Sequence, residues 1–133
     1  MRRRCRFRDP AWELTRARTR DEGPDWSDRV AATVPGNVLI DLERAGIVPD
    51  PLVSENSRSC GWTGEWTYWY RLRFRMTDLQ DAPCADVNRW VLQFDGIDTF
   101  AEVFLNGESL GTPANMFRRH RFDVTEILRN DRE

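Results

Sequence analysis

The chain has 133 residues, enough for one domain with a hydrophobic core and too few for a second. Its formal net charge is −2 at pH 7, so no overall positive field attracts nucleic acid or an anionic membrane. Three cysteines and one histidine argue against a disulfide framework and against a zinc site. We therefore expect one domain in a reducing cytoplasm, without metal or cofactor, and with neither nucleic acid nor membrane as a partner.

The first eleven residues are interpreted as an N-terminal arm. Residues 1–8, MRRRCRFR, hold five arginines but lack the apolar run that a secretory signal needs after its positive end. A nucleic-acid-binding arm is conceivable from these charges. A frayed terminus that leads into the first strand is the interpretation that we favour, with the folded domain covering residues 12–133.

Residues 12–14, WEL, are interpreted as the opening strand, and residues 16–28 as a polar loop broken by Gly23 and Pro24. The segment VLIDLERA then predicts a short amphipathic helix, with Asn37 as its cap and Gly46 at its end. Its apolar residues share one helical face: Val38, Leu39, Leu42 and Ala45. Asp41 and Glu43 are expected on the solvated face.

Residues 47–60 contain two prolines and no periodicity, which predicts an extended loop. The aromatic segment GWTGEWTYWYRLRFR follows and predicts a strand with one buried face, because apolar residues alternate with arginines toward its end. Trp62 and Trp66 offer flat apolar surfaces on which a sugar ring could stack. Packing in the core is the alternative for both side chains.

Residues 90–94 and 100–105 predict two strands, and Asn106-Gly107 predicts a type I′ hairpin turn that returns the chain through residues 108–110. We expect these three strands to form a meander. Asp95 and Asp98 could be taken for paired catalytic carboxylates, but turn chemistry explains their positions better. Residues 122–128 predict a strand that passes into a turn capped by Asp123 or Thr125.

Several collinear motifs together resemble a known family. They are ATVPGNVLIDLERAGIVPDP, GWTGEWTYWYRLRF, FDGIDTFAEVFLNGESLG and NMFRRHRFDVT. They resemble the N-terminal sugar-binding domain of glycoside hydrolase family 2, and NMFR is most similar to its β-mannosidase branch. The resemblance implies an all-β fold: an antiparallel jelly-roll, galactose-binding-like β-sandwich with one short helix. The family domain continues with further strands, so we expect the sandwich to be incomplete at the C-terminus.

The resemblance also implies an activity for a longer parent protein. Such a protein would remove terminal non-reducing β-D-mannose from β-mannosides with retention, using two glutamates of a downstream (β/α)₈ barrel. This segment would carry no catalytic residue, would pack on the barrel and would shape the pocket. Asn56 matches a family position that leans toward that pocket, and Trp62 and Trp66 are the next candidates for substrate binding. Leu52, Val53 and Ser57 depart from the family pattern around Asn56.

Three alternatives stay open. A free-standing carbohydrate-binding module would use exposed aromatic side chains as its platform. The same domain could belong to a β-galactosidase, a β-glucuronidase or an exo-β-glucosaminidase, which share the sandwich and the hairpin. A nucleic-acid binder would use the arginine-rich arm and would show strongly salt-dependent affinity.

Overall fold

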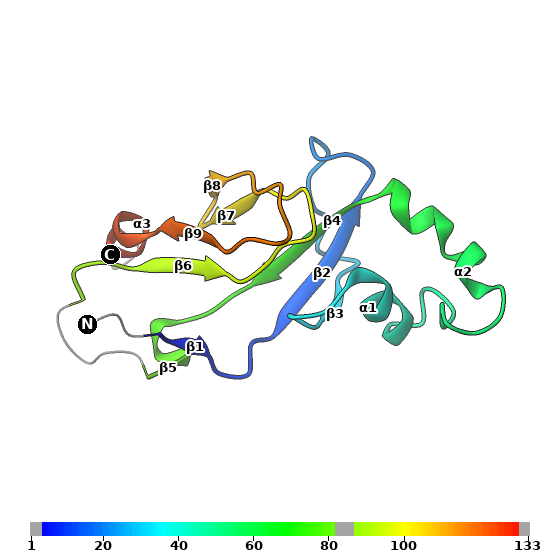
Figure 1. The fold of residues 1–133 in the computed structure, drawn as a ribbon, viewed down its shortest axis with the longest axis horizontal. Helices are drawn as coiled ribbons and strands as arrows, with labels where there is room; N and C mark the ends of the chain where they lie inside the picture. Colours follow the sequence, from blue (N-terminus) through cyan, green and yellow to red (C-terminus); the bar gives the residue numbers. More distant parts are fainter. Residues whose placement is uncertain (1–3, 82–86, 131–133) are drawn as a thin grey trace. The chain divides into compact units, whose positions relative to one another are not determined.

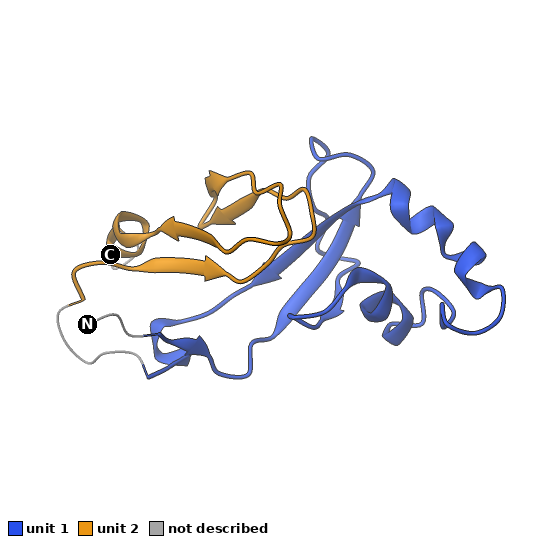
Figure 2. Ribbon diagram, in the orientation of Figure 1, with its two compact units in different colours: residues 1–82 blue, residues 83–133 orange. Residues whose placement is uncertain are grey.

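The computed structural model describes residues 4–81 and 87–130, and every strand pair within them is antiparallel. The predicted mostly β, antiparallel architecture is therefore confirmed. The chain divides into two compact units, Met1–Ala82 and Pro83–Glu133, each with its own small sheets (Figure 2). The two units are described in turn.

The first unit is built on a three-stranded sheet with β2, Trp12–Ala17, at its centre (Figure 1). Its neighbours are β3, Val30–Ala32, and β4, Thr67–Leu72. The register places Leu14 opposite Val30 on one side and Tyr70 on the other. Leu14 is only 1% exposed, so the opening strand carries the most buried apolar side chain of the unit. The predicted strand at residues 12–14 is confirmed and extends to Ala17.

A smaller ribbon pairs β1, Arg6–Phe7, with β5, Leu79–Gln80, next to the 3₁₀ turn η2, Met76–Asp78. The Phe7 ring meets Phe74 edge to face, with ring centroids 4.8 Å apart. Edge-to-face contacts of this kind stabilise aromatic pairs beyond simple area burial. Two residues of the N-terminal arm therefore take part in pairing within the first unit.

The helix α1, Val38–Arg44, begins and ends as its sequence predicts. Asn37 caps it by accepting a hydrogen bond from the Ile40 amide at 3.1 Å, and Gly46 follows it with a φ of +71°. Leu42 packs into a cluster of buried side chains: Leu14, Leu42, Val48 and Cys60. The helix thus covers the sheet through the predicted apolar face.

The solvated position predicted for Asp41 is wrong. Asp41 is 1% exposed, and its Oδ1 atom accepts a hydrogen bond from the Thr33 amide at 3.0 Å. The segment before α1 folds back against the helix and leaves this amide without a backbone partner in the sheet. The Asp41 carboxylate therefore binds the backbone of the segment before the helix, although helical periodicity assigns its position to solvent.

The prediction of one helix is also wrong, since the described residues contain three α-helices. The loop predicted over residues 47–60 ends in α2, Asn56–Ser59, which is followed by the 3₁₀ helix η1, Gly61–Glu65. The Cys60 amide bonds to the Asn56 carbonyl at 3.1 Å, and the Thr63 amide to the Cys60 carbonyl at 3.0 Å. Single turns held by such local bonds are too short to leave a periodic hydrophobic pattern.

The second unit contains two two-stranded sheets. The strand β6, Val91–Phe94, pairs with β9, His120–Asp123, while β7, Val103–Leu105, pairs with β8, Glu108–Gly111. The hairpin turn is confirmed, because Asn106 and Gly107 have φ values of +50° and +82°.

The predicted meander is wrong, because β6 pairs with β9 rather than with β7. The connection between β6 and β7 is hydrogen-bonded to the segment after β8: the Ala101 amide donates to the Pro113 carbonyl at 3.0 Å. The segment after β9 also differs from the prediction, because the predicted capped turn continues as a helix, α3, Thr125–Asn130. Asp123 supplies the cap, since its Oδ1 atom accepts from the Thr125 amide at 3.1 Å.

Candidate functional site

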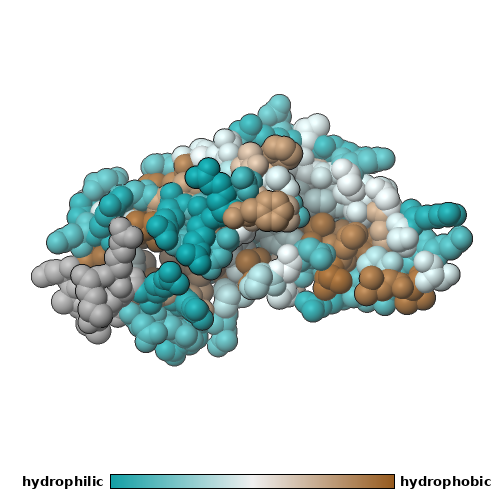
Figure 3. Space-filling view, viewed as in Figure 1, coloured by the Kyte–Doolittle hydropathy of each residue, from teal (hydrophilic) through white to brown (hydrophobic). Residues whose placement is uncertain are grey.

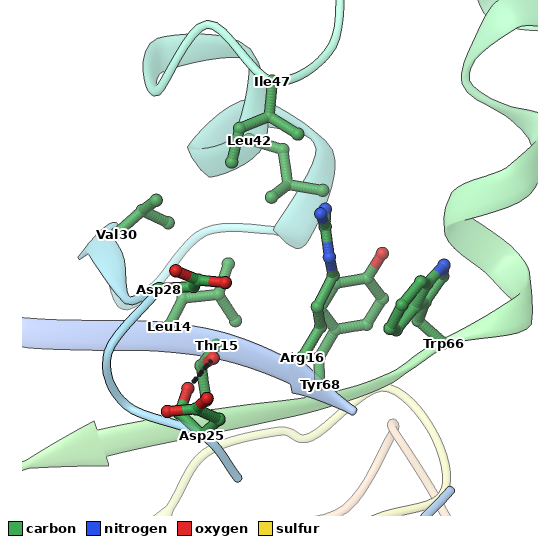
Figure 4. Close-up of a pocket in the computed structure, with 10 residues that line it drawn as sticks. All are labelled: Leu14, Thr15, Arg16, Asp25, Asp28, Val30, Leu42, Ile47, Trp66 and Tyr68. Atoms are coloured by element: carbon green, nitrogen blue, oxygen red, sulfur yellow. Dashed lines mark hydrogen bonds between the residues drawn. The ribbon is translucent and has the colours of Figure 1, made fainter. Parts of the chain in front are cut away.

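A hollow of about 330 Å³ lies on the first unit, and the end of β2 forms its floor (Figure 4). Leu14, Thr15 and Arg16 come from that strand, and α1 and the turn after it contribute Leu42 and Ile47. Val30 adds one more apolar side chain, and the remaining wall is polar or aromatic: Asp25, Asp28, Trp66 and Tyr68. On the face shown in Figure 3, apolar side chains gather over α1 and the segment after it, where Ile47 is 39% and Leu52 87% exposed.

Arg16 and Trp66 line this hollow, and both contact Trp62, which is outside the lining. The β2–β4 register sets Arg16 opposite Tyr68, so Trp66, just before β4, lies beside the end of β2. The Arg16 guanidinium carbon lies 5.0 Å from the ring centroids of both Trp62 and Trp66. The two rings meet edge to face at 6.5 Å, and Arg18 lies 4.0 Å from the Trp66 centroid. These distances are typical of cation–π contacts.

The polar groups of the hollow have defined protonation states. Partial burial raises the pKa of the Tyr68 phenol, which remains neutral and donates to the Thr63 carbonyl at 2.9 Å. Hydrogen bonds from Ser27 lower the pKa of Asp25, which stays ionised at neutral pH. A general acid needs a raised pKa, so Asp25 is suited to accepting hydrogen bonds and not to donating a proton in catalysis.

The structure brings together two of the three predicted binding residues. Trp62 and Trp66 are neighbours, and both are half-buried. Asn56 does not line the hollow; it begins α2, and its Nδ2 atom donates to the Asp50 carbonyl at 3.0 Å. The asparagine side chain therefore holds the preceding loop in place through its amide nitrogen.

Sequence reasoning missed four of the polar lining residues: Arg16, Asp25, Asp28 and Tyr68. The sequence predicts a polar loop over residues 16–28, and Tyr68 lies in the aromatic segment that predicts a strand, so neither pattern singles out these side chains. Only the strand register places Arg16 opposite Tyr68 and brings the loop residues over the same floor. No local pattern carries that information.

The other charged clusters have structural partners. Glu13 forms ion pairs of 2.7 Å with Arg29 and Arg71, and the hydrogen bond from Arg71 is the largest cause of its lowered pKa. Asp95 accepts a hydrogen bond from the Nε2 atom of the Gln93 side chain at 2.7 Å and pairs with Arg119 at 3.1 Å. Within residues 4–81 and 87–130, no three His, Cys, Asp or Glu side chains form a group able to hold a metal ion. In the same ranges, no helix combines the length and apolar character of a membrane span.

The fold is that of a galactose-binding-like domain. The sequence profile described as "Glycosyl hydrolase 2 galactose-binding domain-like" matches residues 12–133. The chain therefore belongs to the galactose-binding-like domain family of glycosyl hydrolase 2, and the resemblance found in the sequence is confirmed.

The particular relatives are β-mannosidases. The chain is 36% identical over 121 residues to β-mannosidase B of Thermothelomyces thermophilus, covering 91% of this chain and 13% of that protein. It is 32% identical over 130 residues to the β-mannosidase of Rattus norvegicus, covering 95% and 14%. The crystal structure of the β-D-mannosidase from Dictyoglomus thermophilum superposes with a TM-score of 0.76 at 30% identity, covering 94% and 14%. The chain thus spans only a small part of the length of each relative.

Proposed function

We propose that this chain acts as the N-terminal sugar-binding-like domain of a β-mannosidase-type glycoside hydrolase. The parent protein removes terminal non-reducing β-D-mannose from β-mannosides with retention of configuration. The observation that carries this proposal is the identity to named β-mannosidases along 91 to 95% of the chain. The catalytic glutamates and their (β/α)₈ barrel belong to the remainder of the parent protein.

In this proposal residues 12–133 form a jelly-roll sandwich that further strands of the parent complete, and residues 1–11 form its arm. The domain packs on the barrel and narrows the pocket, so that only chain ends of a β-mannoside enter. The 13 to 14% coverage of the relatives supports a role as one part of a larger enzyme. We place the parent in the cytoplasm on the cysteine content alone.

Asn56, Trp62 and Trp66 are the proposed substrate-binding residues. The Asn56 amide nitrogen is engaged with Asp50, while its Oδ1 atom accepts no hydrogen bond within the described residues. This oxygen can accept from a sugar hydroxyl without disturbing the loop. Trp62 and Trp66 follow Asn56 in the sequence and supply apolar ring surfaces. Arg16 contacts both rings, and Arg18 contacts that of Trp66.

The test uses the full-length parent enzyme and its Asn56→Ala variant. Loss of one hydrogen bond to the substrate should lower kcat/KM for an aryl β-mannoside by about three- to tenfold. Ser57→Ala is the matched control, since Ser57 is an exposed neighbour in the same helix. Unchanged turnover and apparent affinity in Asn56→Ala would show that the pocket role is wrong.

Substrate choice is tested on the same enzyme. Aryl β-mannoside should be hydrolysed faster than the corresponding β-galactoside, β-glucuronide and β-glucosaminide. A preference for one of the other three would assign the domain to that branch of the family.

A free-standing carbohydrate-binding module is the second candidate, favoured by the position of Trp66 in an open hollow. The size of the natural gene product separates the two candidates. A polypeptide several times longer than 133 residues supports the hydrolase, whereas a product of this length that binds β-mannan oligosaccharides without cleaving them supports the module.

A further inference from the structure

The loop that leads to Asn56 has a buried base and an exposed tip. It joins α1 to α2 (Figure 1), and Val48 and Cys60, on either side of it, are 5% and 3% exposed members of the buried cluster. The Cys60 thiol donates to the Pro49 carbonyl at 3.7 Å, which ties the two ends together. Leu52, at the tip, is 87% exposed. Burial holds the two ends of this loop, so its tip is shaped mainly by hydrogen bonds within the loop.

Asp50 accepts three of these hydrogen bonds. Its Oδ1 atom accepts from the Leu52 amide at 2.8 Å. Its carbonyl accepts from the Val53 amide at 3.2 Å and from the Nδ2 atom of Asn56 at 3.0 Å. Asp50 is followed by Pro51, and aspartate in the first position of a β-turn with proline in the second is a favoured combination. Asp50 thus both forms the turn and binds the asparagine.

This turn sets the direction of the Asn56 side chain. A carbonyl oxygen can only accept, so the nitrogen end of the Asn56 amide faces Asp50 and its Oδ1 end faces away. The backbone amide of Asn56 also donates to the Val53 carbonyl, at 3.1 Å. Asn56 is therefore bound to both ends of the turn, through its side chain and through its backbone. A polar group held in this way loses little rotamer entropy when it binds a ligand.

The geometry points to Asp50 as a positioning residue for substrate binding by the parent enzyme. Asp50 does not touch the substrate; its turn fixes the direction in which Asn56 presents the Oδ1 acceptor. The inference rests on the proposed pocket role of Asn56 and adds the residue on which that role depends. An exposed residue outside such a turn usually tolerates substitution, so replacing the exposed Asp50 is a specific test.

The experiment is a double-mutant cycle in the full-length parent enzyme, with an aryl β-mannoside as substrate. Asp50→Ala keeps the backbone carbonyl but removes the acceptor of the Leu52 amide, so the turn loosens and Asn56 is held less firmly. We expect kcat/KM to fall by about threefold. In an Asn56→Ala enzyme the same change should have an effect of less than about 1.5-fold, because residues that act through one another are not additive. A purely structural role of Asp50 would lower kcat/KM equally in both enzymes.

Two further variants separate the turn from the charge of Asp50. Asp50→Asn keeps an Oδ1 acceptor and forms the same kind of turn, so it should retain kcat/KM within about 1.5-fold. Glu55→Ala is the matched control, because it removes a negative charge from the same loop at a side chain that is 80% exposed and pairs with Arg58. This control should leave kcat/KM unchanged. If Asp50→Ala does not fold by circular dichroism, Asp50→Ser replaces it, and its weaker acceptor should lower kcat/KM by about twofold.

The 133-residue chain gives a second readout that needs no turnover. In NMR spectra of the side-chain amides, the Asn56 proton that is bonded to the Asp50 carbonyl should shift less with temperature than the other Nδ2 proton. This difference should shrink in Asp50→Ala. It should persist in Asp50→Asn and in Glu55→Ala.

Unchanged kcat/KM in Asp50→Ala overturns the inference, and so does an equal fall with and without the Asn56 side chain. An Asp50→Asn enzyme as impaired as Asp50→Ala also contradicts it, as do two Asn56 amide protons that behave alike in the unaltered chain. Unchanged turnover in Asn56→Ala is a different result, because it contradicts the proposed pocket role itself. The amide signals of the 133-residue chain then show separately whether Asp50 orients Asn56.

Discussion

The two units of the molecule are stabilised in different ways. The first unit, Met1–Ala82, has a cluster of apolar side chains at most 5% exposed, formed by Leu14, Leu42, Val48 and Cys60. In the described part of the second unit, Pro83–Glu133, the buried residues are Leu105, Pro113, Val124 and Thr125. Phe100 and Phe117 of the second unit are 87% and 90% exposed.

Apolar packing stabilises the first unit, whereas local hydrogen bonds contribute more to the second. A unit with little buried apolar area depends on turn geometry, caps and ion pairs, each of which contributes only modestly. The hairpin at Asn106-Gly107 and the Asp123 cap are such features. We therefore expect substitutions in the core of the first unit to cost most, and local features of the second unit to cost less.

The largest effect is expected for Leu14→Ala. Leu14 is 1% exposed at the centre of the sheet, so its loss leaves a cavity and should lower the free energy of unfolding by about 2 to 5 kcal/mol. Urea denaturation followed by tryptophan fluorescence measures this change. Leu52→Ala, at an 87% exposed leucine, should stay within about 0.5 kcal/mol. Equal costs for the two variants would mean that the first unit has no such core.

Asp41→Ala should come next. It removes a buried carboxylate that accepts from the Thr33 amide, which should lower the free energy of unfolding by about 1 to 3 kcal/mol. Asp41→Asn keeps an Oδ1 acceptor and should cost less. Glu43→Ala, two residues along the same helix, serves as the control in the same denaturation assay. A larger cost for Glu43→Ala would contradict the buried position of Asp41.

Gly107→Ala tests the hairpin of the second unit. Gly107 has a φ of +82°, and an alanine in that conformation should cost about 1 to 2 kcal/mol. Gly64→Ala is the matched control, because a Cβ atom meets no atom within 4 Å at either position, and only Gly107 has a positive φ. Hydrogen exchange of the β7 and β8 amides measures the effect. Unchanged protection in Gly107→Ala would argue against the type I′ turn.

The smallest effect concerns acid stability in the second unit. Hydrogen bonds from Thr125, followed by one from Arg89, lower the pKa of Asp123 to about 2. The ionised carboxylate is favoured by the folded state, so its contribution is complete above the unfolded pKa of about 3.9 and is lost as pH falls through 2.

Stability of the second unit should therefore fall between about pH 4 and pH 2, and this fall should be smaller in Asp123→Asn. Thermal unfolding as a function of pH measures it. Glu108→Gln is the control, since Glu108 is exposed. If Asp123→Asn and the unaltered chain lose stability identically on acidification, Asp123 does not contribute to the acid stability of the second unit.

The sequence by itself determined the features that depend on neighbouring residues and on collinear motifs. The Asn37 cap, the Gly46 stop and the Asn106-Gly107 turn are local, because each needs a backbone conformation that few residue types adopt. The family was also recognisable from the sequence, since several specific motifs occur in one order. The site residues Asn56, Trp62 and Trp66 stay predictions, and the structure adds that the two tryptophans are neighbours.

Only the tertiary structure decided the pairing of β6 with β9, the burial of Asp41 and the hollow that Arg16 lines. Strand pairing over more than twenty residues depends on the competition among all edges of a unit, which no local pattern reports. Asp41 is buried where the segment before α1 packs on the helix and its Thr33 amide donates to the carboxylate, and Arg16 meets Trp66 because the β2–β4 register sets them side by side. Contacts between residues far apart in the chain are set by packing, and a short window of sequence does not contain them.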